Sequence, residues 1–208
     1  EATNEILTPY VLTIKKVVKV YNNKPSSRTS RSNQEKIVQW LEKLNPTILS
    51  EECFTTKIGE GEFEQASSKE FYYQNMVKSY EKIGQYEKCI LIGEEALKII
   101  KKFHYKNKIW ITGRILYSKC MISSNREIDF QNYKTFAEKE NYWFLWHKLA
   151  NICYSFGKFK ESLLYNCKAI YNELIDETKV TLLYNLGLCW ESQGKNDNAI
   201  KYYHACAY

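Results

Sequence analysis

The sequence is poor in the residues that interrupt helices, with only 8 glycines and 3 prolines among 208 residues. Strand-rich folds need many tight turns, which depend on these two residues, so their scarcity favours helices joined by short connections. No apolar stretch approaches the roughly 20 residues that a membrane-spanning helix needs. The amino terminus also lacks a signal-like apolar segment. We therefore expect an all-α protein without a membrane partner.

Closely spaced cysteines are also lacking. The seven cysteines have a shortest gap of 14 residues, between Cys153 and Cys167, so the sequence has no Cys-x-x-Cys and no ligand spacing of the zinc-finger kind. Cys89, Cys153 and Cys206 fall where a small buried residue is expected, and reduced, buried thiols pack as small apolar groups. We predict no metal site, no cofactor, and a cytoplasmic location.

Catalytic patterns are absent as well. The three histidines are 43 and 57 residues apart, and no nucleophile elbow or phosphate-binding loop is found. Gly59-Glu60-Gly61 has neither a preceding strand by pattern nor the third glycine of a dinucleotide fingerprint. We predict that the protein is not an enzyme and name no catalytic residue.

What the sequence does contain is a repeat, most plainly in residues 143–208. Gly157 matches Gly194 at a step of 37, and around them Trp146 matches Leu183. Each copy reads as a helix, a glycine turn and a second helix. One such hairpin cannot bury its apolar face alone, so copies are expected to stack.

The same pattern extends towards the amino terminus. Gly84 precedes Gly157 by 73 residues, or two periods of about 36.5, so one repeat lies between them. That repeat lacks the turn glycine, and its second helix is expected to be shorter, over 128–138. We expect residues 1–69 to hold amino-terminal helices and a connector, and residues 70–208 to hold the repeats, the last continuing beyond Tyr208. The repeats are expected to start near 70, 107, 143 and 180.

Two helices are predicted before the repeats. The first covers 8–21, and a loop follows over 22–31 because that stretch is rich in Pro, Ser and Asn. Ser32 to Glu35 forms a capping box that should open the second helix, and this helix should end before Pro46. Residues 47–68 are expected to be a connector that lies over the first repeat.

The repeat resembles the tetratricopeptide repeat (TPR) family, through a bulky residue, then Leu-Gly or Leu-Ala, an aromatic residue, a turn glycine and small residues in the second helix. The resemblance covers about two thirds of the chain, although the second repeat matches poorly and the usual proline between repeats is absent. It implies a right-handed superhelix of about four repeats. The matching residues are Trp146, Leu149, Ala150, Gly157, Phe159 and Ala169; Leu183, Leu186, Gly187, Trp190, Gly194 and Ala199; and Tyr73, Tyr80, Gly84, Tyr86 and Ala96.

A second resemblance is weaker. The order WLEKLNP, YEKCI and KFHYKNKIW is similar to TPR-like regions that accompany primase and helicase modules in prokaryotic conflict systems of the TOTE type. It implies nothing about the ligand.

The TPR resemblance implies a concave groove, lined by the first helix of each repeat, that holds a peptide or a partner helix. Asn and Gln would bond the backbone of such a peptide, and aromatic rings would contact its apolar side chains. Asn151 and Asn185 occupy clamp-like places, with His147 where chaperone-binding members have Lys. The groove residues implied are Phe71, Gln74, Lys78, Lys108, Phe144, His147, Asn151, Tyr154, Tyr184 and Leu188.

Charge suggests an alternative site. No acid lies between Glu95 and Glu127, and a second acid-free run covers 6–34 and contains Lys15 and Lys16. Cations among aromatic rings suit nucleic acid, because they replace phosphate counterions while the rings stack on bases. The other interpretation is a solvated face above packed aromatics. The basic patch within 98–126 consists of Lys98, Lys101, Lys102, Lys106, Lys108, Arg114 and Lys119.

Two functions follow as hypotheses. The first is a non-catalytic scaffold that binds a protein or peptide in the groove, and the second is an accessory module that binds nucleic acid through the basic patch. Self-association through Tyr202, Tyr203 and Tyr208 of the carboxy-terminal repeat is a further expectation, because an uncapped repeat exposes apolar surface.

Overall fold

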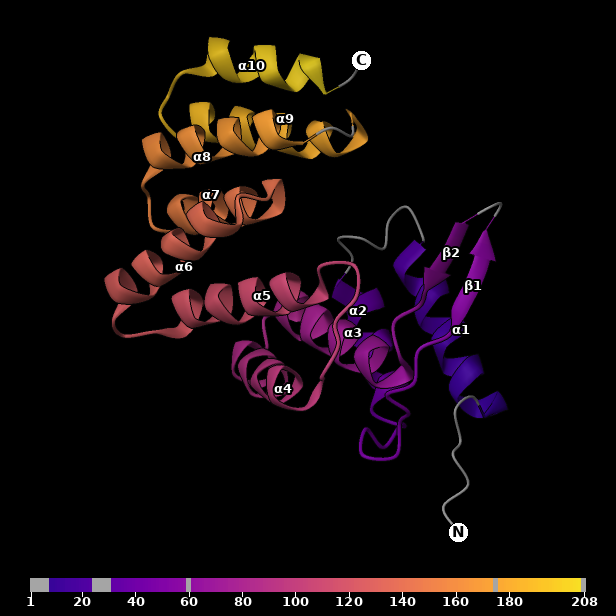
Figure 1. Ribbon diagram of the computed structural model, residues 1–208. Coiled ribbons are helices and arrows are strands. Elements are labelled where there is room, and N and C mark those ends of the chain that lie inside the picture. Colours follow the sequence, from indigo (N-terminus) through magenta and orange to yellow (C-terminus); the bar gives the residue numbers. More distant parts are fainter. Residues whose placement is uncertain (1–7, 24–30, 59–60, 174–175, 207–208) are drawn as a thin grey trace. The chain divides into compact units, whose positions relative to one another are not determined.

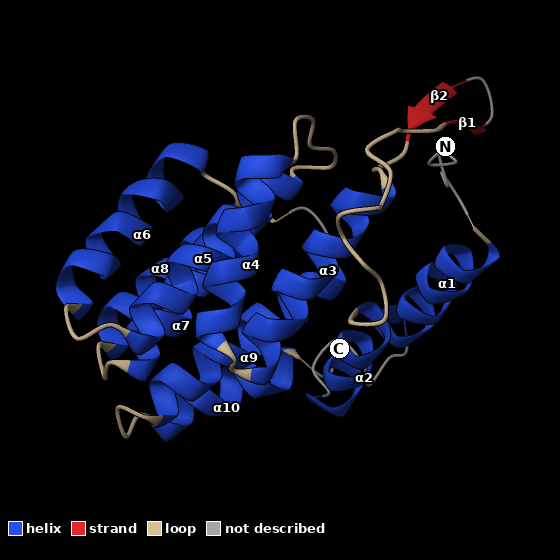
Figure 2. Ribbon diagram, turned by 90° about the horizontal axis from the view of Figure 1, so that it is seen from below, coloured by secondary structure: helices blue, strands red, loops and turns tan. Residues whose placement is uncertain are grey.

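The computed structural model describes residues 8–23, 31–58, 61–173 and 176–206, and within them the regular secondary structure is helical apart from one small hairpin (Figures 1 and 2). The all-α prediction is confirmed. The elements are α1 (Pro9–Asn23), α2 (Arg31–Leu41), β1 (Thr55–Ile58), β2 (Gly61–Glu64), α3 (Ser68–Ile83), α4 (Tyr86–Ile99), α5 (Asn107–Ile122), α6 (Arg126–Glu140), α7 (Trp143–Ser155), α8 (Phe159–Asn172), α9 (Asp176–Glu191) and α10 (Asn196–Ala205).

The chain forms two compact units, Glu1–Ile122 and Ser123–Tyr208. The expected division near residue 69, and the handedness of the superhelix, stay predictions. In the part of the chain that the structure describes, no helix has the length and apolar character needed to cross a membrane.

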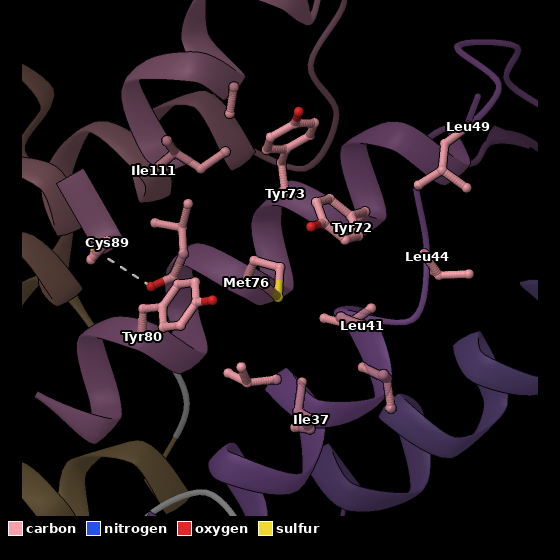
Figure 3. Packing of buried hydrophobic residues seen from close by; sticks show 14 of the residues in the cluster. Ile37, Leu41, Leu44, Leu49, Tyr72, Tyr73, Met76, Tyr80, Cys89 and Ile111 are labelled. Atoms are coloured by element: carbon pink, nitrogen blue, oxygen red, sulfur yellow. Dashed lines mark hydrogen bonds between the residues drawn. The ribbon is translucent and has the colours of Figure 1, made fainter. Parts of the chain in front are cut away.

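The first unit is built around α3. Helix α1 buries Val11, Ile14 and Val18, whose spacing places them on one side of a helix. Helix α2 packs on both α1 and α3, and its Ile37 and Leu41 meet the aromatic and thioether side chains of α3 in one apolar cluster (Figure 3). The two amino-terminal helices are therefore part of the same core as the first hairpin of the repeats.

One buried polar contact joins α2 to α3. The hydroxyl of Ser79 donates a hydrogen bond of 3.0 Å to Oε1 of Gln34, and both side chains are buried. A buried polar group needs a partner of this kind, because leaving it without one costs free energy.

The turn glycines lie where the repeat pattern predicts. Gly84, Gly157 and Gly194 have φ of 79°, 72° and 71°, a left-handed conformation that glycine adopts without steric penalty. The glycine-free repeat ends differently. Helix α6 covers 15 residues, so the expected shorter helix over 128–138 is wrong. Its acidic first turn suits the helix dipole, and Asn141 ends it in the left-handed conformation with φ of 51°.

Helices of the repeats approach closely at small residues. A Cβ added to Gly93 of α4 would lie 2.6 Å from Cγ1 of Ile115 on α5, and one added to Gly187 of α9 would lie 2.3 Å from the ring of Tyr203 on α10. In the second unit, consecutive helices α7, α8, α9 and α10 pack on one another. Helix α10 ends at Ala205, and 207–208 lie outside the described residues.

The segment before α3 departs from the sequence analysis. The expected connector over 47–68 contains an antiparallel hairpin, in which Ile58 pairs with Gly61 and Thr55 with Glu64. A strand thus precedes Gly59, contrary to our expectation, but it pairs with the next strand and starts no dinucleotide fold. The capping box is also wrong, because α2 already includes Arg31, whose Nε donates to Glu35. Helix α2 does end before Pro46, and 24–30 of the predicted loop lie outside the described residues.

Candidate functional site

In the second unit, side chains from α7 and α9 meet around a histidine. The ring of His147 lies between two amides, with Nε2 at 3.4 Å from Nδ2 of Asn151 and Nδ1 at 3.4 Å from Nδ2 of Asn185. About two turns along α7 from His147, the hydroxyl of Tyr154 lies 2.9 Å from Oγ of Ser192. The first helices of two successive repeats therefore share one polar surface, which we call the α7–α9 face.

Tyrosines border the α7–α9 face. The side chains of Tyr154 and Tyr184 are 37% and 49% exposed, which is enough to contact a ligand. Leu188 is half-buried. Phe144, although predicted to line the groove, is buried and stacks on Tyr142 with ring centroids 5.6 Å apart, so it is not available to a ligand.

The tyrosines expected to mediate self-association are engaged within the second unit. The hydroxyl of Tyr203 donates to Glu191 at 2.7 Å, and its ring lies 5.6 Å from that of Tyr184. Tyr202 is half-buried, and Tyr208 lies outside the described residues. Nothing in this arrangement favours self-association over binding of another protein.

The groove residues predicted on α3 lie beside α1. Lys15 of α1 lies over the ring of Phe71 at 5.2 Å from its centroid, and Lys78 donates to Oδ1 of Asn22 at 2.7 Å. Gln74 is half-buried beside them, and Lys108 on α5 is exposed. Helix α1 thus covers part of the α3 surface that was expected to line the peptide groove.

A cleft separates α1 from the hairpin, and Figure 1 shows these elements. Its walls combine three cations with several rings and amides. Burial, and then the charge of Lys19, lower the pKa of Lys15, so an anion in the cleft would relieve an unfavourable charge. The lining residues are Leu12, Lys15, Lys16, Lys19, Phe54, Thr56, Phe63, Gln65, Ala66, Ser68, Phe71, Gln74 and Tyr105.

In the structure, nearby acidic side chains reduce the positive charge of the predicted basic patch. Four of its seven cations pair with acids from outside the acid-free run, and Arg114 and its partner Glu81 are largely buried. Lys98, Lys106 and Lys108 are exposed, while Phe103 packs against the core of the first unit. The pairs are Lys101 with Glu51, Lys102 with Glu64, Arg114 with Glu81 and Lys119 with Glu94.

Comparison with known proteins identifies the fold. No family model and no curated protein matches the chain. Among solved structures, BtubC (BKLC) from P. vanneervenii is 13% identical, with coverage of 95% of this chain and 80% of that chain and a TM-score of 0.51. MamA from Desulfovibrio magneticus RS-1 is 10% identical, with coverage of 96% and 94% and a TM-score of 0.48. The chain has a TPR-like fold. At this identity the likeness establishes the architecture alone.

Most of the cysteines are buried within the helical fold. All seven are free thiols, and four of them, at 89, 120, 153 and 189, are buried. Cys89 and Cys153 lie where the repeat predicts a small buried residue, whereas Cys206 is only half-buried. Burial raises the pKa of Cys153 to about 12, so this thiol stays protonated and packs as an apolar group.

A cluster outside the TPR-like repeats was missed by sequence analysis. Donor atoms of Cys53, Glu64 and His104 all lie within 4.8 Å of one another. They come from the segment before β1, the end of β2 and the loop between α4 and α5. No pattern in the sequence brings them together, because they are 11 and 40 residues apart and the hairpin that aligns the first two was not predicted.

Proposed function

We propose that the protein is a non-catalytic scaffold that binds an extended peptide on the α7–α9 face. The observation that supports this proposal is the position of His147 between Asn151 and Asn185. Two amides and an imidazole from successive repeats offer donors and acceptors at the spacing of side chains on parallel helices. An extended backbone presents alternating donors and acceptors that such groups can satisfy.

Tyrosine supplies the apolar part of this recognition. Tyr154 and Tyr184 are exposed, and they lie on the helices that carry Asn151 and Asn185. A tyrosine covers a large area with few rotatable bonds, so it gains contact at a small cost in conformational entropy. We expect alternate side chains of the peptide to lie against these rings.

The test uses the full chain and a peptide selected from a random display library. Replacing Asn151 and Tyr184 together by alanine should weaken that peptide at least about 10-fold, because a backbone hydrogen bond and a ring contact are lost. The matched control replaces Tyr171 and Asn172 of α8, of which Tyr171 is 88% exposed. Binding is measured by fluorescence anisotropy, and far-UV circular dichroism checks the fold. Equal affinities of the two double variants would refute the site.

A second candidate function is binding of single-stranded nucleic acid in the cleft beside α1. The observation that favours it is the alignment of Lys15, Lys16 and Lys19 opposite Phe63 and Tyr105, which are 51% and 60% exposed. Cations along a groove bind phosphates, and exposed rings stack on bases without regard to sequence. The cleft suits this role better than the basic patch, whose cations largely pair with acids.

Titration of labelled oligo-dT and oligo-U at about 50 and 200 mM salt tests this candidate. Replacing Lys16 and Lys19 by glutamate should remove binding, whereas the same change at Lys101 and Lys106 should alter it little. If the second pair matters more, the basic patch is the site. If neither oligonucleotide binds at the lower salt, the nucleic-acid function is refuted and the peptide function remains.

We further propose a reducing cytoplasm as its location. The seven free thiols are compatible with such a compartment, where disulfides are rare.

A further inference from the structure

The histidine of the missed cluster is held in a defined orientation. Nδ1 of His104 lies 2.6 Å from Oε2 of Glu70, and Oε1 of Glu70 accepts from the backbone N–H of His104 at 2.7 Å and from Nδ2 of Asn107 at 2.8 Å. Glu70 is fully buried at the start of α3. A carboxylate only accepts, so Nδ1 carries the proton and the lone pair of a neutral ring lies on Nε2.

Nε2 of His104 lies close to two further atoms that could bind a metal. The His104 side chain is only 8% exposed, and its Nε2 has no hydrogen-bond partner among the described residues. The nearest carboxylate oxygen, Oε2 of Glu64, is 3.4 Å away but not in hydrogen-bonding geometry. Sγ of Cys53 completes the group within 4.8 Å. A buried imidazole nitrogen without a partner is costly in an ordinary core.

We propose that Cys53, Glu64 and His104 bind a zinc ion. Thiolate, imidazole and carboxylate are the three ligand types that zinc takes in proteins. A tetrahedral ion separates its ligand atoms by roughly 3.3 to 3.7 Å, and the distance from His104 to Glu64 lies in that range. Small side-chain movements bring the sulfur to the same spacing.

The outer contacts match those of a metal site. A metal-binding histidine typically donates its other N–H to a carboxylate, which fixes the tautomer and the ring plane, and Glu70 takes this place here. Tyr105 and Lys106, directly after His104, have φ of 50° and 64°. Left-handed backbone at two successive non-glycine residues is strained, and such strain is concentrated at functional sites.

Zinc binding requires two exchanges. Zinc binds the thiolate form of cysteine, so the thiol of Cys53 releases its proton to solvent as the Zn–S bond forms. Glu64 also pairs with Lys102, and zinc would replace that ammonium group. The side chain of Glu64 is 39% exposed, so water can reach the fourth position.

The site would hold the cleft beside α1 in shape. Each ligand is followed by a residue that lines this cleft, namely Phe54, Gln65 and Tyr105. In the extended segments beside the hairpin, neighbouring residues point to opposite sides, so Cys53 and Phe54, and likewise Glu64 and Gln65, use the two sides of the same segment. The hydroxyl of Tyr105 already donates to the backbone oxygen of Glu64 at 2.8 Å. Zinc would join the hairpin to the α4–α5 loop.

The test titrates the reduced full chain with Zn²⁺ in competition with a chromophoric chelator, and with Co²⁺ as a spectroscopic probe. We expect one equivalent of Zn²⁺ to bind and Co²⁺ to show a thiolate charge-transfer band. Cys53→Ser should abolish the band and weaken Zn²⁺ by more than about 100-fold, beyond the roughly 10- to 100-fold effect of outer contacts. The control is Cys167→Ser, which removes the exposed thiol of the second unit.

Two outcomes would overturn the proposal. One is the absence of a cobalt–thiolate band in the unaltered protein, a result that does not depend on how any variant folds. The other is equal Zn²⁺ affinity of Cys53→Ser and Cys167→Ser with native circular dichroism. In either case His104 is a structural residue between two carboxylates.

Discussion

Removing the buried carboxylate of Glu70 should destabilise the first unit more than any other single loss of charge described above. The side chain is fully buried, and its two oxygens serve three groups on the α4–α5 loop. Glu70→Ala would leave the backbone N–H of His104 and the amide of Asn107 buried without an acceptor. The loop after α4 would lose its main attachment to α3.

The magnitude follows from the number of bonds. Hydrogen bonds to a charged group contribute about 1.5 to 3 kcal/mol each, and removing one partner of a buried pair costs about 3 to 5 kcal/mol. These effects overlap at Glu70, so we expect a loss of about 3 to 5 kcal/mol, a large part of the total stability of a domain. Glu70→Gln should lose less, because its amide oxygen still accepts from His104 and Asn107.

Urea unfolding, followed by circular dichroism, measures this loss. The matched control is Glu35→Ala on α2, which removes an exposed carboxylate paired with Arg31 in the same helix; exposed pairs contribute little. If Glu70→Ala lowers the free energy of unfolding no more than the control does, the three bonds to Glu70 do not hold the loop and the reasoning is wrong.

Two further predictions concern packing. Gly93→Ala should lower the free energy of unfolding by up to about 2 kcal/mol, because overpacking against Ile115, at 2.6 Å, costs about 1 to 3 kcal/mol and the gain in helix propensity is about 1 kcal/mol; increased stability in urea would contradict this. Iodoacetamide at pH 8 should alkylate exposed Cys167 long before Cys153, whose pKa is raised to about 12 and whose thiolate fraction is only about 10⁻⁴. Peptide mass spectrometry follows both sites, and equal labelling of the folded protein would show that Cys153 is not buried.

The repeats could be predicted from sequence because each one requires the same local chemistry. Gly84, Gly157 and Gly194 each end a first helix in the left-handed conformation, and only glycine does so without cost. The sequence also contains a signal for the hairpin. Phe54, Thr56 and Ile58 are two residues apart, as on one side of a strand, and only two residues separate Ile58 from Gly61, a spacing typical of hairpins.

The sites could not be predicted in the same way. The run between Glu95 and Glu127 has no acid of its own, but Glu81 and Glu94 reach its cations from neighbouring helices. An acid-free segment therefore does not establish an acid-free surface. The cluster of Cys53, Glu64 and His104 depends on the hairpin register and also on the bonds of Glu70 to His104. Those bonds join residues 34 positions apart and leave no pattern in the sequence.

The contact between Gln34 and Ser79 limits which substitutions these two positions can accept during evolution. Sliding α2 by one turn along α3 would leave both polar groups in an apolar core, so the contact selects one register as a single buried polar residue does in a coiled coil. A change at either position alone would be disfavoured, whereas replacement of both by apolar residues could be tolerated. In related chains these two positions should therefore vary together.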